Sequence, residues 1–280
     1  IYNGLNLTCG TLVVREDRSN PHSRTITLAV AILKTPSSHP APDPVIYLSG
    51  GPGESPLDDF APLFDVVGLQ TYLGNRDLVI FDPRGTLNSQ PSLDCPELRE
   101  AQYAALDQNQ SLGQQVALLR ASLMACHSRL VRAGIDLSLY NTVTNAADVN
   151  DLITALGYRQ VNLNGGSYGS RLALEVMRDF PHRIRSVILD AVLPPQVTFF
   201  TSLPPAFMRS FDTLFAGCAA EALCSQNFPH LESALYALIA QLNAHPATIT
   251  AQDPTTGYTY SVVLNGQRLV DLLVLALYQT

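Results

Sequence analysis

The sequence has little positive charge, with 17 Lys and Arg residues against 24 Asp and Glu, and Lys34 is the only lysine. The net charge is −7, and no run of basic residues is present to neutralise phosphates, which argues against a nucleic-acid partner. Long apolar runs are also lacking. Residues 272–277 form an apolar run far shorter than the roughly 20 residues that span a bilayer. We therefore expect no membrane span.

Metal-site cysteine spacing is absent as well. None of the five cysteines lies in the C-x-x-C arrangement that is typical of zinc and thioredoxin sites. We expect neither a metal nor another cofactor. The cysteines are Cys9, Cys95, Cys126, Cys218 and Cys224.

Two cysteine pairs are spaced so that each can close a disulfide. Cys218 and Cys224 are six residues apart, and Cys95 and Cys126 flank a predicted helical region. One interpretation is two disulfides in a secreted or periplasmic protein, with Cys9 left over, and the other is a set of buried free thiols in a cytosolic protein. We favour the disulfides. No basic-then-apolar leader opens the sequence, so this location implies a signal peptide that has been removed.

The composition, 46% hydrophobic and 15% charged, is that of a globular protein with a sizeable core. Residues 11–14 and 25–33 are rich in β-branched side chains and are separated by turn formers, which predicts an antiparallel hairpin. Residues 45–48 and 78–81 are short, almost uninterrupted apolar runs. Such runs are typical of parallel strands buried on both faces.

Strands and helices then alternate. Apolar residues recur at helical spacing over 111–132 and 144–156, where Asn145 and Asp148 resemble a capping box. A strand over 160–163, a helix over 168–180 and a strand over 185–189 follow. This alternation predicts an α/β fold with a mostly parallel sheet and crossover helices. We place a boundary near residue 196, between a core of residues 1–195 and a mainly helical segment of residues 196–280.

Gly165-Gly-Ser-Tyr-Gly169 fits the G-x-S-x-G pattern, with a strand before it and an amphipathic helix after it. A sharp strand-to-helix turn holds a serine hydroxyl exposed, and small residues at 165 and 169 permit the close approach of neighbouring chains. Ser167 is thus the candidate catalytic nucleophile. The Tyr168 amide, at the start of the helix, points where an oxyanion would form. The alternative is a glycine-rich turn with an incidental serine.

A second glycine-rich loop, Ser49-Gly-Gly-Pro-Gly53, directly follows the buried strand 45–48. A loop at the carboxyl end of such a strand can bring backbone N–H groups to a developing oxyanion. We expect Gly51 to be the donor, with Gly50 beside it. The alternative is a plain Gly/Pro turn.

Four motifs in order resemble the α/β-hydrolases that include prolyl iminopeptidases and tripeptidyl aminopeptidases. They are the two glycine motifs above, Phe81-Asp-Pro-Arg-Gly-Thr86 and Leu189-Asp-Ala-Val-Leu-Pro-Pro195. The resemblance covers residues 5–195 and is closest to secreted tripeptidyl-aminopeptidase-like members. It implies the α/β-hydrolase fold, makes residues 196–280 the beginning of a helical cap, and implies an exo-aminopeptidase acting on a free N-terminus. Ser49 stands where the family usually has His.

Three charged residues lie beside these motifs. By resemblance Asp82 and Arg84 shape the wall beside the nucleophile, and we expect Arg84 to be a bidentate partner of a nearby carboxylate rather than a substrate contact. Glu54 stands where the family often has a small residue. It either pairs with a substrate's N-terminal ammonium or is simply solvated.

The sequence lacks an obvious general base. In this fold the acid and the His follow the serine, and only His182, His230 and His245 do so. His182 falls at the far end of the helix that Ser167 begins, and the other two lie in the helical segment. We expect the fold to be incomplete at the C-terminus, with the Asp and His supplied by a C-terminal remainder of the enzyme. The alternative triad uses Asp190 as acid and His245 as base.

The leading functional hypothesis is a serine hydrolase that forms an acyl-enzyme on Ser167 and acts on a peptide or ester substrate. A carboxylesterase uses the same machinery, since specificity resides in the cap. A non-catalytic binding module of the same fold is the third hypothesis. It would suit the missing His but not the complete G-x-S-x-G motif.

Overall fold

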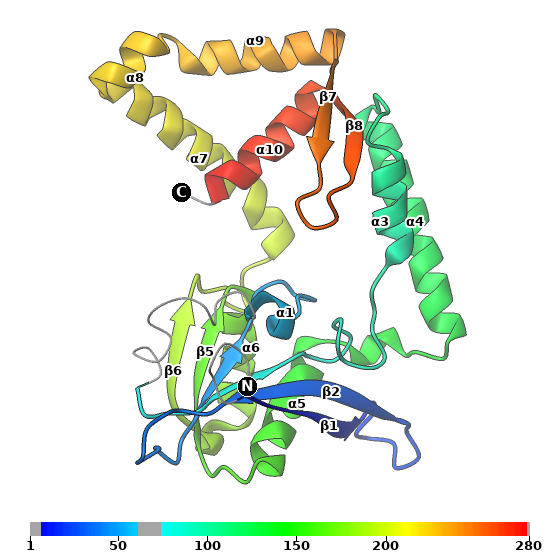
Figure 1. Cartoon of the computed structure of the whole chain (residues 1–280), viewed down its shortest axis with the longest axis vertical. Coiled ribbons are helices and arrows are strands. Elements are labelled where there is room, and N and C mark those ends of the chain that lie inside the picture. Colours follow the sequence, from blue (N-terminus) through cyan, green and yellow to red (C-terminus); the bar gives the residue numbers. More distant parts are fainter. Residues whose placement is uncertain (1–6, 61–73, 279–280) are drawn as a thin grey trace. The chain divides into compact units, whose positions relative to one another are not determined.

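The structure is a computed structural model that describes residues 7–60 and 74–278. By their contacts the residues fall into two compact units (Figure 1). Unit 1 consists of Ile1–Asp94 and Leu130–Val197, and unit 2 of Cys95–Arg129 and Thr198–Thr280.

Unit 1 is built on a six-stranded sheet in the order β1-β2-β4-β3-β5-β6. Its strands are β1 (Leu7–Arg15), β2 (Thr25–Leu33), β3 (Val45–Leu48), β4 (Leu78–Phe81), β5 (Val161–Gly166) and β6 (Ile184–Asp190). The hairpin β1-β2 and the pair β2-β4 are antiparallel, whereas β4-β3, β3-β5 and β5-β6 are parallel. The predicted strands and the mostly parallel sheet are confirmed.

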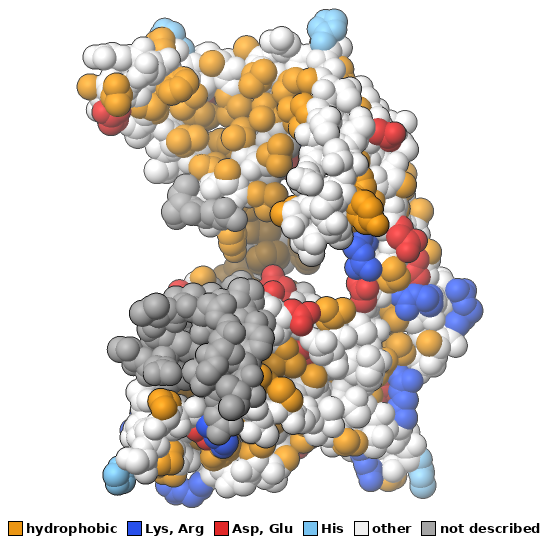
Figure 2. Space-filling model, in the orientation of Figure 1, with side chains coloured by type: hydrophobic (Ala, Val, Ile, Leu, Met, Phe, Trp, Pro, Cys, Tyr) orange, Lys and Arg blue, Asp and Glu red, His pale blue; other side chains and the backbone are white. Residues whose placement is uncertain are grey.

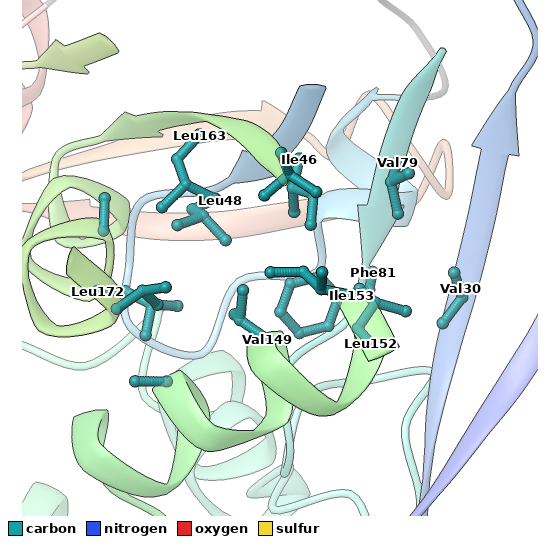
Figure 3. Packing of buried hydrophobic residues seen from close by; sticks show 14 residues of the cluster. Val30, Ile46, Leu48, Val79, Phe81, Val149, Leu152, Ile153, Leu163 and Leu172 are labelled. Carbon is teal, nitrogen blue, oxygen red and sulfur yellow. The ribbon is translucent and has the colours of Figure 1, made fainter. Parts of the chain in front are cut away.

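Two helices cover one face of this sheet, α5 (Thr142–Ala155) and α6 (Tyr168–Asp179). Val149, Leu152 and Ile153 of α5 pack against Phe81 and the neighbouring strands (Figure 3). On the opposite face Leu57, in the short helix α1 (Pro56–Phe60), packs on the cluster formed by residues 33, 78 and 80. All four residues of β4 are therefore buried, which is why its sequence is uninterruptedly apolar.

The predicted capping box at Asn145 and Asp148 is wrong. Helix α5 begins one turn earlier, because Asn141 is extended (φ −142°, ψ 173°) and its side chain accepts a hydrogen bond from the Thr144 amide at 3.0 Å. Thr144 Oγ1 accepts in turn from the Asn141 amide at 3.2 Å, which completes the box. Asn145 and Asp148 lie inside the helix and are buried, so their polar groups serve tertiary contacts instead.

Asp148 is the carboxylate that binds Arg84, and both side chains are 0% exposed. The Arg84 Nε donates to Oδ2 at 2.7 Å and Nη2 to Oδ1 at 2.9 Å, which confirms the predicted bidentate pair. Arg84 Nη1 also donates to the carbonyls of Glu16 and Leu139, each at 2.9 Å. Arg18 approaches Asp148 from solvent and also binds Asp151 at 2.7 Å. Arg84 thus connects the segment after β4 to helix α5 and to the residue that follows β1.

We expect Asp148→Asn to lower the free energy of unfolding by about 3–5 kcal/mol, because it leaves the buried Arg84 cation without its counter-charge. The matched control is Asp151→Asn, one turn further along α5, whose side chain is 40% exposed. The exposed ion pair that Asp151 forms with Arg18 contributes no more than about 1 kcal/mol to the free energy of unfolding. Urea unfolding of both variants measures the difference, and equal losses would show that Arg84 does not depend on Asp148.

Unit 2 combines helices with a two-stranded antiparallel sheet. Its elements are α3 (Pro96–Ala104), α4 (Leu112–Arg132), α7 (Phe199–Ala220), α8 (Ala222–Asn227), α9 (Leu231–Ala244), β7 (Ala247–Gln252), β8 (Thr259–Leu264) and α10 (Gly266–Tyr278). The sequence interpretation assigned residues 95–129 to the core, but they group here with the C-terminal segment. The reason lies in hydrogen bonds to the backbone carbonyls of this segment: the Arg268 side chain donates from Nη2 to the Ala105 carbonyl at 2.7 Å, and the Val263 amide donates to the Leu106 carbonyl at 2.8 Å.

Both predicted disulfides are present in unit 2, Cys95–Cys126 and Cys218–Cys224, and Cys9 is an exposed free thiol in unit 1. Hydrophobic side chains are exposed on the helices of unit 2 (Figure 2). Phe200 of α7 is 83% exposed. Among the described helices, none combines the length and the apolar character needed to cross a membrane.

Candidate active site

Ser167 lies at the turn between β5 and α6, as the G-x-S-x-G motif predicts. Its backbone adopts φ 52° and ψ −119°, a positive φ that is uncommon for a residue other than glycine. The Ser167 amide donates to the Asp190 carbonyl at the end of β6, at 3.0 Å, which holds the turn against the neighbouring strand. Ala191, the next residue after β6, also has positive φ, at 45°. Strained conformations of this kind cluster at functional sites, where the surrounding structure maintains them.

The glycines on either side of Ser167 are required by close backbone packing. A Cβ atom on Gly169 would lie 1.8 Å from the Leu48 carbonyl oxygen at the end of β3, and one on Gly165 would lie 2.4 Å from the Gly169 carbonyl oxygen. The middle glycine differs, because a Cβ on Gly166 would meet no atom within 4 Å. The turn therefore needs small residues at 165 and 169, as predicted, but not at 166.

The glycine loop after β3 reaches the candidate nucleophile. A Cβ on Gly50 would lie 3.4 Å from Ser167 Cβ and 3.8 Å from Ser167 Oγ, so the two residues are in direct proximity. Gly51 next to it has φ +96°, a conformation that side chains other than glycine's rarely adopt. The structure thus brings Gly50 and Ser167 together, and Gly51 is the adjoining residue.

Tyr168, the first residue of α6, offers only its backbone to the turn. Its phenol oxygen lies 3.1 Å from Thr142 Oγ1 and accepts from the Asn145 side chain at 3.4 Å, so the ring is directed toward α5. The phenol is thus engaged with α5, and the backbone amide at the helix N-terminus is the part of Tyr168 that faces the turn. The roles of Gly50, Gly51 and Tyr168 as oxyanion donors remain predictions.

The Asp82 side chain forms hydrogen bonds with residues that follow the glycine loop. Its carboxylate is fully buried at the end of β4 and accepts from the Ser55 hydroxyl at 2.8 and 2.9 Å. It also accepts from the backbone amides of Leu57 and Asn88, each at 3.1 Å. Ser55 and Leu57 lie shortly after the loop, so Asp82 ties this part of the chain to the sheet. Sequence reasoning placed Asp82 beside the nucleophile but did not identify these partners. Leu57 and Ser55 lie 25 and 27 residues before Asp82 in the sequence.

Two residues of the first turns of α6 fix the segment after β6, and sequence reasoning missed both. Ser170 Oγ accepts from the Leu193 amide at 2.8 Å, and Arg171 Nη2 donates to the carbonyls of Pro194 at 2.8 Å and Val197 at 2.7 Å. Ser170 and Arg171 are more than 20 residues from these partners, and no local sequence pattern links them. Only the folded structure reveals the contacts.

The surroundings of the glycine loop are acidic. Glu54, Asp58 and Asp59 are exposed. Although Asp59 is exposed, partial desolvation of its carboxylate, followed by the negative charges of Asp58 and Asp82, raises its pKa above the usual value. This end of the sheet therefore favours cationic groups over anionic ones.

No hydrogen bond joins Ser167 to a histidine within the residues that the structure describes. His182 lies in the 3-10 turn η3 (Pro181–Arg183), beyond the C-terminal end of α6 and so at the far end of the helix from Ser167, as predicted. His230 and His245 flank α9 in unit 2. Asp190 lies next to the turn through its backbone carbonyl, and its side chain is exposed. The source of the base stays a prediction.

One group of residues in the described part of the chain has the ligand types of a metal site: Cys95, Glu97 and Cys126. Its two sulfurs are bonded to each other in a disulfide, so thiolate ligands are not available there.

Comparison with known proteins identifies the fold family. Residues 43–268 match the family model described as alpha/beta hydrolase fold. The chain belongs to the alpha/beta hydrolase fold family. The predicted fold class is thereby confirmed, and so is the resemblance to aminopeptidase-like members, which the similar proteins include.

Three similar proteins show which kinds of alpha/beta hydrolase this chain resembles. The chain is 28% identical to serine protease Hip1 of Mycobacterium tuberculosis (strain ATCC 25618 / H37Rv) over 222 residues, 77% of this chain and 42% of that protein. It is 30% identical to tripeptidyl aminopeptidase of Streptomyces lividans over 195 residues, 68% of this chain and 36% of that protein. A solved structure of a proline iminopeptidase-related protein from Thermus thermophilus is 22% identical, with a TM-score of 0.37 over 65% of this chain and 44% of that one. The chain thus spans less than half the length of these proteins.

Proposed function

We propose that this chain carries the nucleophile and the oxyanion loop of a serine hydrolase that forms an acyl-enzyme on Ser167. The observation that carries the proposal is the turn itself: Ser167 is held at φ 52° between β5 and α6, with Gly50 of the glycine loop against its side chain. Such a turn places a hydroxyl beside backbone N–H groups at the end of a parallel sheet.

In the proposed reaction Ser167 Oγ attacks the substrate carbonyl carbon and its proton passes to a base. The amides of Gly51 and Tyr168, with Gly50 beside them, stabilise the negative oxygen, and removal of one such donor typically costs about 100- to 1000-fold in kcat. The bond from the carbonyl carbon to the leaving amine or alcohol then breaks as the proton returns to the leaving group. Water hydrolyses the ester on Ser167 and regenerates the hydroxyl.

The base and its acid belong to a C-terminal remainder of the same enzyme in this proposal. The order of the triad in this fold, with acid and His after the serine, supports it. The position of His182 at the far end of α6 supports it too. The alternative, Asp190 with His245, keeps the triad within this chain.

Peptides with a free N-terminus are the proposed substrates, and the similarity to a tripeptidyl aminopeptidase supports an exo-aminopeptidase. An ester substrate is the second candidate. It is favoured by a similarity of 26% identity over 277 residues, 93% of this chain and 52% of that protein, to carboxylesterase B of Mycobacterium tuberculosis (strain CDC 1551 / Oshkosh). The two disulfides support a secreted or periplasmic location.

Labelling with a fluorophosphonate probe tests the proposed split of the triad. We expect this chain alone to label at least about 100-fold more slowly than the full-length protein, because the hydroxyl lacks its base. Adding His245→Ala to the full-length protein should leave the labelling rate unchanged. Rapid labelling of the isolated chain that His245→Ala abolishes would contradict the split and favour the alternative triad. A full-length protein that does not label would favour a non-catalytic module.

A further inference from the structure

Glu54 lies closer to the candidate nucleophile than its place in an exposed loop suggests. The loop after Gly51 turns back on itself, so that a Cβ on Gly51 would meet the Glu54 amide at 3.1 Å and Glu54 Cγ at 3.3 Å. The Glu54 carboxylate reaches Gly50, where Oε2 is 3.4 Å from the position of a Cβ. Ser167 Oγ is 3.8 Å from that same point, so the two oxygens are separated by at most about 7 Å.

This carboxylate has no hydrogen-bond or salt-bridge partner among residues 7–60 and 74–278. Its neighbours Asp58 and Asp59 are acidic and would not neutralise it. A negative charge beside a proposed oxyanion site opposes the charge that develops in catalysis. The arrangement becomes favourable when the substrate itself brings a cation between them.

We propose that Glu54 is a specificity-determining residue that binds the α-ammonium group of the residue whose carbonyl Ser167 attacks. The inference rests on the proposed function and deepens it, because it commits the enzyme to releasing single amino acids from a free N-terminus. The substrate class is a peptide, amide or ester of an amino acid with an unblocked amine.

The distances distinguish this substrate from a longer one. Standard backbone geometry puts the α-nitrogen about 2.5 Å from the carbonyl carbon of its own residue. The carbonyl carbon lies about 3 Å from the attacking oxygen in a reactive complex. An ammonium there is within reach of a carboxylate about 7 Å or less from Ser167 Oγ. If a tripeptide were released instead, the ammonium would be two residues further away, adding about 7 Å in an extended chain, and Glu54 would not reach it.

The experiment compares alanine p-nitroanilide with N-acetylalanine p-nitroanilide in the full-length enzyme and in Glu54→Gln. We expect the substitution to lower kcat/KM for the free amine by about 10- to 100-fold, the value of a charge-assisted hydrogen bond. For the acetylated substrate kcat/KM should stay the same or rise, because the charge that opposes the oxyanion is removed. Asp59→Asn removes one negative charge nearby and should leave the ratio of the two values within about threefold.

A ratio that Glu54→Gln leaves unchanged would overturn the inference. So would a wild-type preference for trialanine p-nitroanilide that is insensitive to Glu54→Gln, since the ammonium would then bind elsewhere. Glu54→Asp, which keeps the charge on a shorter side chain, should retain part of the preference. A preference lost to the level of Glu54→Gln while the thermal midpoint stays at the wild-type value would contradict the inference, because the charge would then be present without effect. If the wild type hydrolyses neither substrate and does not label with fluorophosphonate, the proposed function itself has failed.

Discussion

Ser167→Ala is expected to lower kcat of the full-length enzyme by about 10⁴- to 10⁶-fold, because the acyl-enzyme cannot form without the hydroxyl. The residual rate would come from substrate binding and the proposed oxyanion donors, which the substitution leaves in place. Steady-state hydrolysis of an amino-acid p-nitroanilide measures the effect.

The fold should not change, since the alanine keeps the Cβ atom and the backbone bond from residue 167 to the Asp190 carbonyl. We expect the thermal midpoint to stay within about 2 °C of the wild-type value. A variant that retains more than about one hundredth of the wild-type kcat would show that Ser167 is not the nucleophile.

Gly169→Ala is expected to destabilise unit 1 by at least about 3 kcal/mol or to prevent folding. The added methyl group would lie 1.8 Å from the Leu48 carbonyl oxygen, so α6 and β3 would have to separate where they hold the site together. Urea unfolding and the soluble yield of the variant measure the loss.

Gly166→Ala is the matched control three residues away, because its methyl group would meet no atom within 4 Å. Its stability should differ from the wild type by no more than about 1 kcal/mol, because without a clash the substitution acts mainly through the reduced freedom of the unfolded chain. If both glycine substitutions proved equally mild, the close contact of α6 with β3 would be refuted.

Much of unit 1 follows from local patterns. The boundaries of β2, β3 and β4 coincide with those expected, because apolar runs of β-branched residues between turn formers leave few alternatives. The turn that carries the candidate nucleophile was predictable for the same reason, because the G-x-S-x-G pattern lies between a strand and a helix that both have clear hydrophobic patterns. Its catalytic role stays a prediction.

The misses come from contacts between distant segments. Asn145 and Asp148 had the spacing of a capping box, but the buried cation of Arg84 binds Asp148 inside the helix, and Asn141 caps it instead. Residues 95–129 were assigned to the core from their place in the sequence. Their actual neighbours are set by contacts such as that of Arg268 with Ala105, which are 163 residues apart. No local pattern encodes such pairs.

The measurement that tests the account most directly is the location of the acyl group during turnover. The full-length enzyme would be mixed with an amino-acid p-nitrophenyl ester, quenched in acid within the first turnovers and digested for mass spectrometry. The account predicts the mass of one aminoacyl group on the peptide that contains Ser167, and none in Ser167→Ala. An acyl group on another residue, or turnover with no covalent intermediate, would contradict it.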